Sequence, residues 1–339
     1  MRSIVIVGNS LDFHVGHHLE VAARQMGLSV KLCNVAEAFE GSFFLRKLNW
    51  VLGGHRPPKI ATFERKVLAV CHEFQPDQLI ATGIAPLTRE SLETIKKMGI
   101  GLVNYLTDDP WNPVLRAPWF LRAMASYDHV FSPRLSNIED LKRNGCRKVS
   151  YLPFAYSSEV HYLEPPQTHD EKKHFECDVV FVGGADKDRT PYISALLKAR
   201  LNVHLYGGYW NKSSYTRGSH RGMADARTMR IATGCAKVTL CLVRRSNRDG
   251  HCMRSFEAPA MGACMLTEGT EEHRDIFGPE GEAVLYFKNL DEMVKKAQYL
   301  TGNPDVCRRL VLAAHELVVQ GRHTYVDRLK VMIERSEVT

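Results

Sequence analysis

Two carboxylates stand eight positions apart in the second half of the chain. Asp249 lies in a polar, glycine-containing loop after the apolar run Val238–Val243, and Glu257 lies in the short helical segment that follows. A carboxylate has two oxygens and can accept both hydrogen bonds of a ribose diol. The loop can present backbone amides to a diphosphate, and Arg254 can add a cationic contact. This pattern is typical of a site for a phosphorylated nucleoside.

The segment from Lys187 to Arg254 is strongly basic. It carries fourteen Lys or Arg residues against three Asp, in a chain whose net charge is +7. A local excess of eleven positive charges costs stability through self-repulsion unless an anion binds nearby. A solvated basic face is the ordinary interpretation of such a run. Here the charges cluster at the turns between expected elements, so a diphosphate or another polyanion explains them equally well.

Acidic and imidazole side chains follow expected strands in the first half of the chain. Asp108 and Asp109 come directly after the strand Gly101–Leu106. One of them is expected to accept a proton from an acceptor hydroxyl or to hold its geometry, with a helix N-cap as the alternative. His14 and Asn9 lie in the loop after the first strand, where they can contact an acceptor or a diphosphate.

The loop of residues 8–18 lacks the Gly-x-Gly-x-x-Gly pattern of dinucleotide-binding turns, which argues against a nicotinamide cofactor. It contains three histidines, but only His14 and His18 have the i, i+4 spacing of a helical metal site, and Gly16 lies between them. The adjacent acids Asp108 and Asp109 also lack the Asp-x-Asp spacing with which two carboxylates can hold one metal ion. We therefore expect no metal ion.

The elements that must position these residues alternate between strand and helix along the whole chain. Strand–helix alternation at this spacing predicts parallel sheets covered by helices on both faces, with ligands bound at the carboxyl ends of the strands. The expected strands are Ser3–Val7, Ser29–Cys33, Gln78–Ala81, Gly101–Leu106, His129–Phe131 and Val149–Leu152, followed by Asp178–Val182, Val203–Tyr206, Val238–Val243, Cys264–Thr267 and Ala283–Phe287.

The alternation divides into two domains. A polar stretch, Tyr156–His174, is the best candidate for a linker. The prediction is an α/β protein of two Rossmann-like, doubly wound parallel-sheet domains with a cleft between them and helices at the C-terminal end. The expected ranges are 1–160 for the acceptor-side domain, 175–320 for the nucleotide-binding domain, and 321–339 for a terminal helix that can pack back on the first domain.

Composition narrows the class of protein further. A length of 339 residues suits two domains, and a hydrophobic fraction of 44% is that of a globular protein. We find no apolar run long enough for a signal peptide or a membrane span, so a cytoplasmic protein is expected. The nine cysteines are scattered without Cys-x-x-Cys spacing, which favours free thiols in a reducing compartment.

Several motifs together resemble a known family. The run from Arg254 through Phe-Glu-Ala-Pro-Ala-Met-Gly-Ala263 is similar to the C-terminal signature of CgeB-like, spore-maturation-type glycosyltransferases of the GT-B fold. The resemblance covers about residues 100–330, and the first hundred residues match only in general style. Its other motifs, in order, are Asn104–Asn112, Tyr127–Ser132, Gly145 with Val149–Ala155, Phe181–Gly184 and His323–Arg328.

The resemblance assigns a donor site to the second domain. Glu257 matches the second glutamate of the Glu-x7-Glu motif of related retaining enzymes, which holds the donor ribose. Asp249 stands where that motif has its first glutamate and is one methylene shorter. It either contacts the donor sugar or only forms an ordinary Asp-Gly turn. Lys187 and Arg189 match basic residues that meet donor phosphates, or else form a solvated loop. The remaining expected donor-site residues are Arg254, Gly183, Gly250, His251 and Asn9.

The resemblance also implies a reaction. A hydroxyl acceptor would attack a nucleotide-diphosphate sugar with retention of configuration, without metal or further cofactor, and a UDP-sugar is the expected donor. Asp108, Asp109 and His14 are the candidates for handling the acceptor proton. The sequence leaves open whether the acceptor is a glycan, a protein, a small molecule or a modified nucleic acid. A sugar-nucleotide epimerase of the same fold and a non-catalytic nucleotide-sugar or nucleic-acid binding protein are the alternatives.

Overall fold

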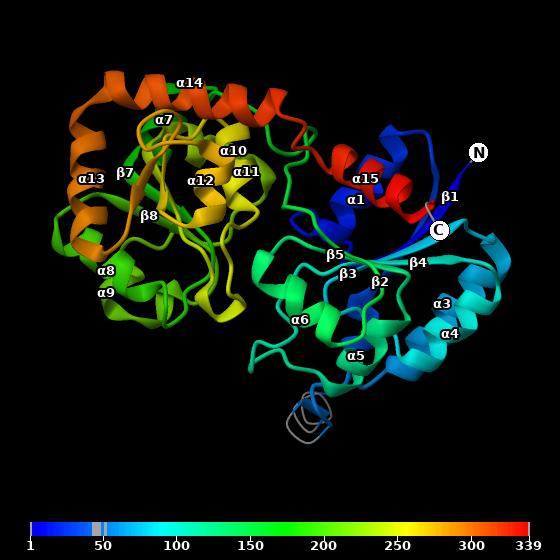
Figure 1. Ribbon diagram of the computed structural model, residues 1–339. Helices are drawn as coiled ribbons and strands as arrows, with labels where there is room; N and C mark the ends of the chain where they lie inside the picture. Colours follow the sequence, from blue (N-terminus) through cyan, green and yellow to red (C-terminus); the bar gives the residue numbers. More distant parts are fainter. Residues whose placement is uncertain (1, 43–48, 51–52, 338–339) are drawn as a thin grey trace. The chain divides into compact units, whose positions relative to one another are not determined.

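The computed structural model describes residues 2–42, 49–50 and 53–337, and its contacts divide the chain into two compact units. The first unit comprises Met1–Pro153, the short segment Ser246–Arg248 and the terminal segment Tyr325–Thr339. The second comprises Phe154–Arg245 and Asp249–Thr324. Figure 1 shows each unit as a sheet flanked by helices.

The first unit is built on a six-stranded parallel sheet of strand order β2-β1-β3-β4-β5-β6. Its interior strands are mostly apolar because helices cover both faces, whereas the edge strands β2 and β6 are half-buried and partly polar. The interior strands β1 and β3 leave no apolar side chain exposed. The strands are β1 (Ser3–Gly8), β2 (Ser29–Asn34), β3 (Gln78–Thr82), β4 (Gly101–Tyr105), β5 (His129–Ser132) and β6 (Val149–Tyr151).

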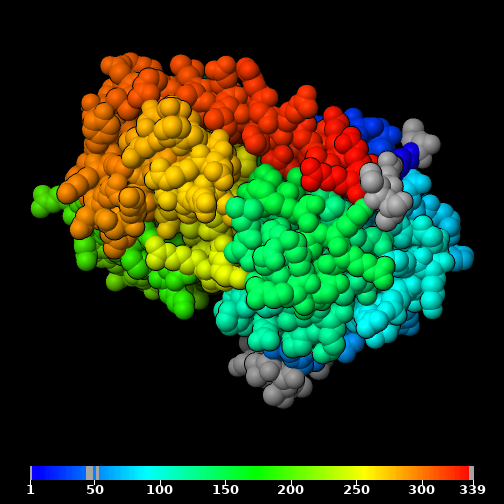
Figure 2. Space-filling model, in the orientation of Figure 1, coloured from blue at the N-terminus to red at the C-terminus, as the bar shows by residue number. Residues whose placement is uncertain are grey.

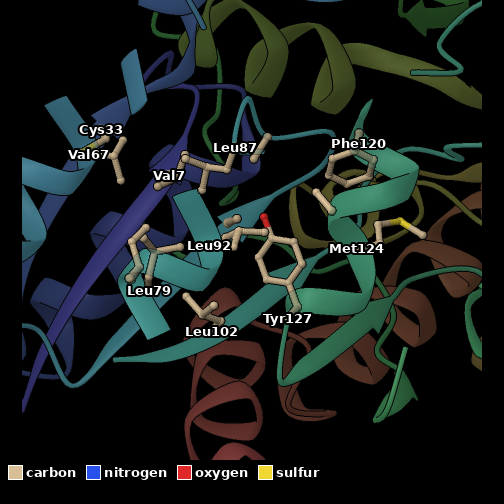
Figure 3. Close-up of a cluster of buried hydrophobic side chains, with 14 of the residues drawn as sticks. Val7, Cys33, Val67, Leu79, Leu87, Leu92, Leu102, Phe120, Met124 and Tyr127 are labelled. Carbon is tan, nitrogen blue, oxygen red and sulfur yellow. The ribbon is translucent and has the colours of Figure 1, made fainter. Parts of the chain in front are cut away.

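Helices on one face of this sheet enclose its larger core. Alternate strand residues such as Val7, Leu79 and Leu102 belong to one buried apolar cluster with helix residues such as Val67 and Phe120, several of which Figure 3 draws. The helices are α3 (Ile60–Phe74), α4 (Arg89–Lys97), α5 (Pro118–Ala123) and α6 (Ile138–Arg143). Helices α1 (Val15–Gln25) and α15 (Tyr325–Glu337) pack against each other, and the His18 and Tyr325 rings stack with centroids 4.9 Å apart.

The second unit contains a five-stranded parallel sheet of order β11-β10-β9-β7-β8. Its strands are β7 (Cys177–Val182), β8 (Val203–Tyr206), β9 (Ala236–Cys241), β10 (Met265–Glu268) and β11 (Leu285–Phe287). The main core lies beneath α8 (Thr190–Lys198), α13 (Leu290–Gly302) and α14 (Pro304–Gln320). Figure 2 shows the residues of α13 and α14, in orange, at the surface of this unit. The remaining helices are α7 (His169–Phe175), α9 (Ser214–Arg217), α10 (Ala226–Cys235), α11 (Arg254–Ala260) and α12 (Glu271–Phe277).

The fold class expected from the alternation is confirmed. Every expected strand is present, and its ends lie within two residues of the predicted ones. In the part of the chain that the structure describes, no helix combines the length and the apolar character needed to cross a membrane. All nine cysteines are free thiols.

The linker prediction for Tyr156–His174 is wrong, because this segment is built into the second unit. Thr168 caps α7 by accepting a hydrogen bond from the Glu171 amide at 3.0 Å. Arg227 forms ion pairs with Glu171 at 2.7 Å and with Glu164 at 3.1 Å. The polar composition reflects an exposed helix with a capping residue, and composition alone does not separate that from a linker.

Candidate functional site

The strand order of the first unit has a switch point between β1 and β3, where connections leave in opposite directions. Parallel sheets bind ligands at such points, beyond the carboxyl ends of the strands. The backbone is tightly packed there, because a Cβ atom on Gly8 would lie 2.7 Å from Thr82 Oγ1 and 2.8 Å from Gly16 Cα. Asn9 shapes the following loop by accepting a hydrogen bond from the Leu11 amide at 3.0 Å. The structure thus places Asn9 at this edge of the sheet.

His14 and Asp108 meet at the same edge. His14 precedes α1, and a Cβ atom on Gly83 would lie 3.0 Å from Asp108 Oδ2, which puts that carboxylate beside the end of β3. Burial lowers the pKa of His14, while the nearby charges of Asp108 and Asp12 act in the opposite direction. The imidazole is therefore neutral at neutral pH. A neutral imidazole beside a carboxylate can accept a proton and have the resulting charge stabilised.

Asp109 has a different environment, which corrects its assignment as a catalytic residue. It is buried, and Arg248 binds its two oxygens at 2.6 and 3.0 Å. Its Oδ1 also accepts hydrogen bonds from the Trp111 amide and from Asn137 Nδ2, each at 3.0 Å. With both oxygens engaged, Asp109 fixes the loop after β4 and the segment Ser246–Arg248, so of the two adjacent aspartates Asp108 is the better candidate for proton transfer.

The switch point of the second unit lies between β7 and β9. The turn after β7 is packed against the turn after β8, because a Cβ atom on Gly207 would lie 2.5 Å from the Gly183 carbonyl oxygen. Trp210 Nε1 donates to the same oxygen at 2.7 Å. Gly183 therefore keeps its predicted position at the carboxyl edge, in a turn whose shape depends on glycine.

Arg189 and Arg244 come together at this switch point, one after β7 and the other after β9. Arg189 donates to the Gly184 carbonyl oxygen at 3.1 Å and lies 3.6 Å from Asp186 Oδ2. Burial lowers the pKa of Arg189, and the charge of Arg244 lowers it further. Among the described residues, no carboxylate forms an ion pair with the exposed Arg244 guanidinium. Asp186 and Asp249 offset part of the charge of Arg189, and the two neighbouring guanidinium groups together can attract an anion.

Lys187 lies on the same turn as Arg189 and is exposed to solvent. Arg244 was part of the basic segment but was not singled out from the sequence. Its position directly after the apolar run Val238–Val243 was the signal, because residues at that point reach the carboxyl edge of a parallel sheet.

The loop that carries Asp249 is held from two sides. Asp249 Oδ2 accepts a hydrogen bond from the Arg244 amide at 3.3 Å, and the Asp249 amide donates to the Arg244 carbonyl oxygen, also at 3.3 Å. A Cβ atom on Gly250 would lie 2.4 Å from Glu272 Cδ, so any larger residue would require the Glu272 side chain to move. Thr270 Oγ1 donates to the Gly250 carbonyl oxygen. Asp249 and Gly250 therefore set the path of this loop.

His251 was predicted to contact the donor, and the structure corrects this. The ring is fully buried, with Nδ1 2.5 Å from Glu272 Oε2 and Nε2 accepting from the Phe154 amide at 3.1 Å. Nδ1 therefore carries the proton, and both ring nitrogens are engaged within the unit. His251 anchors the loop to α12 and has no nitrogen available for a ligand.

Glu257 and Arg254 are brought together on α11. Glu257 Oε2 lies 2.6 Å from Arg254 Nη1, and Oε1 lies 3.6 Å from His161 Nε2. His161 Nδ1 accepts from the Ser157 amide at 3.0 Å, so Nε2 carries the ring proton that faces Glu257. Burial, helped by the charge of Arg254, lowers the pKa of His161 to about 3 and keeps it neutral.

The Glu257 side chain is 4% exposed and that of Arg254 is 22% exposed, so Arg254 is the accessible member of the pair. His161 was not predicted from the sequence, because it lies in the segment that was assigned to a linker. A charged residue at the end of β10 was also missed. Glu268 accepts from the Val243 amide at 2.8 Å and pairs with Arg245 at 3.4 Å, which secures the start of the loop after β9.

Comparisons with known proteins give three findings. Residues 189–334 match a family model described as glycosyl transferase-like, and this range includes Arg189, Arg244 and Glu257. No curated protein matches the chain. Sucrose-phosphate synthase from Thermosynechococcus elongatus is similar in structure, with a TM-score of 0.69, 12% identity and coverage of 99% of this chain and 98% of that one.

HepE from Anabaena, solved with UDP and glucose, has a TM-score of 0.67 at 12% identity and covers 99% of both chains. A putative UDP-N-acetylglucosamine 2-epimerase from Listeria monocytogenes has a TM-score of 0.58 at 11% identity, covering 99% of this chain and 98% of that one. The chain has the GT-B fold. Likeness at these identities establishes the architecture, and transferases and epimerases share it.

Proposed function

We propose that this GT-B chain is a glycosyltransferase that moves a sugar from a nucleotide-diphosphate sugar to a hydroxyl acceptor. The observation that carries the proposal is the pairing of Arg189 with Arg244 at the β7/β9 switch point. A diphosphate can accept charge-assisted hydrogen bonds from both guanidinium groups. The glycosyl transferase-like match supports the proposal, because it spans both arginines.

The donor is assigned to the second unit. Arg189 and Arg244 hold the diphosphate, and Arg254, oriented by Glu257 at 2.6 Å, adds a third cation. The ribose is assigned to Glu257, in line with the motif that it matches. HepE is described in complex with UDP and glucose, and on that likeness we assign a UDP-sugar as the donor here. The motifs at Asn104–Asn112 and His323–Arg328 favour the CgeB-like subgroup.

The chemistry follows from charge. Negative charge develops on the leaving diphosphate as the sugar bond breaks, and fixed guanidinium groups stabilise that charge in the transition state. They do the work for which other transferases use a metal ion, so the proposed reaction is metal-independent. In the retaining reaction the leaving group helps to remove the acceptor proton, and His14 with Asp108 is assigned to the acceptor hydroxyl in the first unit.

A melting-temperature screen against UDP-, GDP-, ADP- and dTDP-sugars tests the donor assignment. We expect one nucleotide series to raise the melting temperature, because a ligand that binds only the folded state stabilises it. Glu257→Ala should lose most of that shift while the free protein stays folded. An unchanged shift in the variant would remove Glu257 from the donor site.

An epimerase is the second candidate, since proteins of that activity share the fold. It differs in needing no acceptor. Incubation of the enzyme with the stabilising nucleotide sugar alone, followed by chromatography of the sugar, separates the two. We expect an unchanged sugar without acceptor; an epimerised nucleotide sugar would replace the transferase proposal.

A further inference from the structure

Two cysteines lie in contact beside the proposed donor loop. Cys241 is the last residue of β9, Cys252 lies two residues before α11, and their Sγ atoms are 3.6 Å apart. Cys241 is buried, whereas Cys252 is partly exposed. A disulfide has an S–S length of about 2.05 Å, so the sulfurs need to approach by roughly 1.5 Å. The backbone has already brought the pair within reach of a covalent bond.

The surroundings of this thiol pair are polar. Ser255 Oγ lies 3.7 Å from Cys241 Sγ and accepts a hydrogen bond from the Cys252 amide at 3.1 Å. His273 Nδ1 donates to the Glu268 carbonyl oxygen at 2.8 Å, so its Nε2 is an acceptor for the Ser255 hydroxyl, also at 2.8 Å. The thiols therefore lie against a buried hydrogen-bonded relay, where charge on sulfur is better tolerated than in an apolar core.

The two thiols are unequal. The S–H group of Cys241 donates toward Cys252 and lowers the pKa of Cys252 to about 7, and Arg254 acts in the same direction. The same interaction, together with burial, raises the pKa of Cys241 well above its ordinary value. A partly exposed thiolate next to a protonated thiol is the arrangement of an attacking and a resolving cysteine.

A second pair in the same unit provides a contrast. Cys264 and Cys307 are neighbours, but both lie in the apolar core cluster of the unit. Burial and the contact with Cys307 raise the pKa of Cys264. Proximity of two sulfurs is thus common to both pairs, and only Cys241 and Cys252 combine it with solvent access and polar surroundings.

We propose that Cys241 and Cys252 form a reversible disulfide when a hydroperoxide oxidises the protein. The Cys252 thiolate attacks the peroxide oxygen, the O–O bond breaks, and the released alkoxide or hydroxide takes up the proton that Cys252 had lost. Cys252 is then a sulfenic acid. The Cys241 sulfur attacks the Cys252 sulfur, the S–O bond breaks, and hydroxide leaves with the Cys241 proton as water. Two thiols and one hydroperoxide give one disulfide, one alcohol or water, and one further water.

The disulfide also has a consequence for the donor site, and this part rests on the proposed function. It closes a covalent ring that contains Arg244 and Asp249. The loop is fixed from the other side by the bond of Thr270 to Gly250 and by the contact of His251 with Glu272. Drawing Cys252 toward Cys241 strains these bonds and displaces Arg244, so we expect oxidation to weaken donor binding several-fold and reductant to restore it.

Peptide mapping of the intact protein tests the disulfide without any assay of activity. The reduced protein is treated with a small molar excess of hydrogen peroxide, alkylated with iodoacetamide and digested with trypsin. Arginines between the two cysteines place them on separate peptides, Val238–Arg244 and Asp249–Arg254. We expect these peptides linked, two hydrogens lighter than their sum, and released by dithiothreitol. If Cys252 stays alkylatable, or is linked to another cysteine, the proposal is overturned.

Two cysteine variants test the roles assigned to Cys241 and Cys252. Cys241→Ser should leave Cys252 as a sulfenic acid that dimedone traps, and the matched control Cys264→Ser should form the Cys241–Cys252 link as the wild type does. Donor affinity is then measured on the reduced and the linked protein. A link without change in affinity would overturn the coupling to the donor site. A reduced protein that binds no nucleotide sugar would contradict the proposed function, while the peptide map would still decide the disulfide.

Discussion

The two units of the chain have the same strand order around their switch points but place different side chains there. In each, the first strand lies between the second and the third, in the orders β2-β1-β3 and β8-β7-β9. In each, glycines allow close backbone packing at that switch point, at Gly8 in the first unit and at Gly207 in the second. The first unit adds an imidazole and a carboxylate, whereas the second adds two guanidinium groups.

This difference separates two tasks. His14 is neutral and lies near Asp108, which suits the transfer of a proton. Arg189 and Arg244 carry positive charge at neutral pH, and only Arg189 forms an ion pair among the described residues, with Asp186, which leaves a net positive pair that suits a stable anion. Similar sheets thus acquire different functions from the few residues that follow their strands.

The largest effect is expected for His14→Gln. Removal of a positioned proton acceptor should lower turnover by about 10²–10⁴-fold. Donor affinity should stay within about twofold of the wild-type value, since the change lies outside the second unit. Steady-state kinetics and a nucleotide titration on the same preparation check both statements, with His17→Gln, in the first turn of the helix that follows His14, as the control. Equal losses in turnover and donor affinity would contradict the assignment of proton transfer to the first unit and donor binding to the second.

Arg244→Ala should act on the other side of the comparison. Loss of a charge-assisted contact to the diphosphate is expected to weaken donor binding by about 10–100-fold. Calorimetric titration measures this. Lys198→Ala is the matched control, because it removes an exposed cation from the same unit at the end of α8. If both variants lose the same affinity, the net positive charge of the unit attracts the donor, and the arginine pair has no specific role.

Asp108→Asn and Asp109→Asn should have different effects, the first on turnover and the second on stability. The buried Asp109 carboxylate accepts bonds from Arg248, Trp111 and Asn137, so its neutral replacement should reduce the free energy of unfolding by about 2 kcal/mol. Asp108→Asn should leave stability within about 0.5 kcal/mol and reduce turnover. Denaturant unfolding and initial rates distinguish them. A destabilised Asp108→Asn variant would contradict the assignment.

The smallest effect concerns pH. Because burial lowers the pKa of His14, the neutral form persists as the pH falls below 6.5, and activity should be lost only at lower pH. Asp108 opposes this lowering, so Asp108→Asn should move the acid limb of kcat/KM to still lower pH. A pH–rate profile of both proteins measures the limb. An acid limb above pH 6.5 in the wild type would show that another group limits the rate.

The sequence predicted the fold, and it predicted which residues follow the strands better than it predicted the environment of each side chain. Strand periodicity and the rule that ligands meet the carboxyl ends of strands were sufficient to place His14, Asp108 and Arg189. Both rules use only local sequence patterns, so they apply even when contacts between distant residues are unknown. They could not distinguish Asp108 from Asp109, because both follow the same strand.

The missing information lies in contacts between residues far apart in the sequence. Arg248 binds Asp109 across 139 positions, and His251 accepts from the Phe154 amide across 97. Neither pairing leaves a periodic signal, so two residues predicted to meet ligands were in fact bonded within the protein. His161 escaped notice for the same reason, since its contact with Glu257 depends on the folded path of a segment that was assigned to a linker.

The most direct test of the account measures what the diphosphate contributes to binding. The nucleoside diphosphate that gives the largest melting shift and its parent nucleoside are titrated into the wild type and into the Arg189→Ala/Arg244→Ala variant. We predict that the wild type binds the diphosphate far more tightly than the nucleoside, and that the variant loses most of this preference while its affinity for the nucleoside is kept. An equal preference in both proteins would contradict the assignment of the arginine pair to the donor diphosphate.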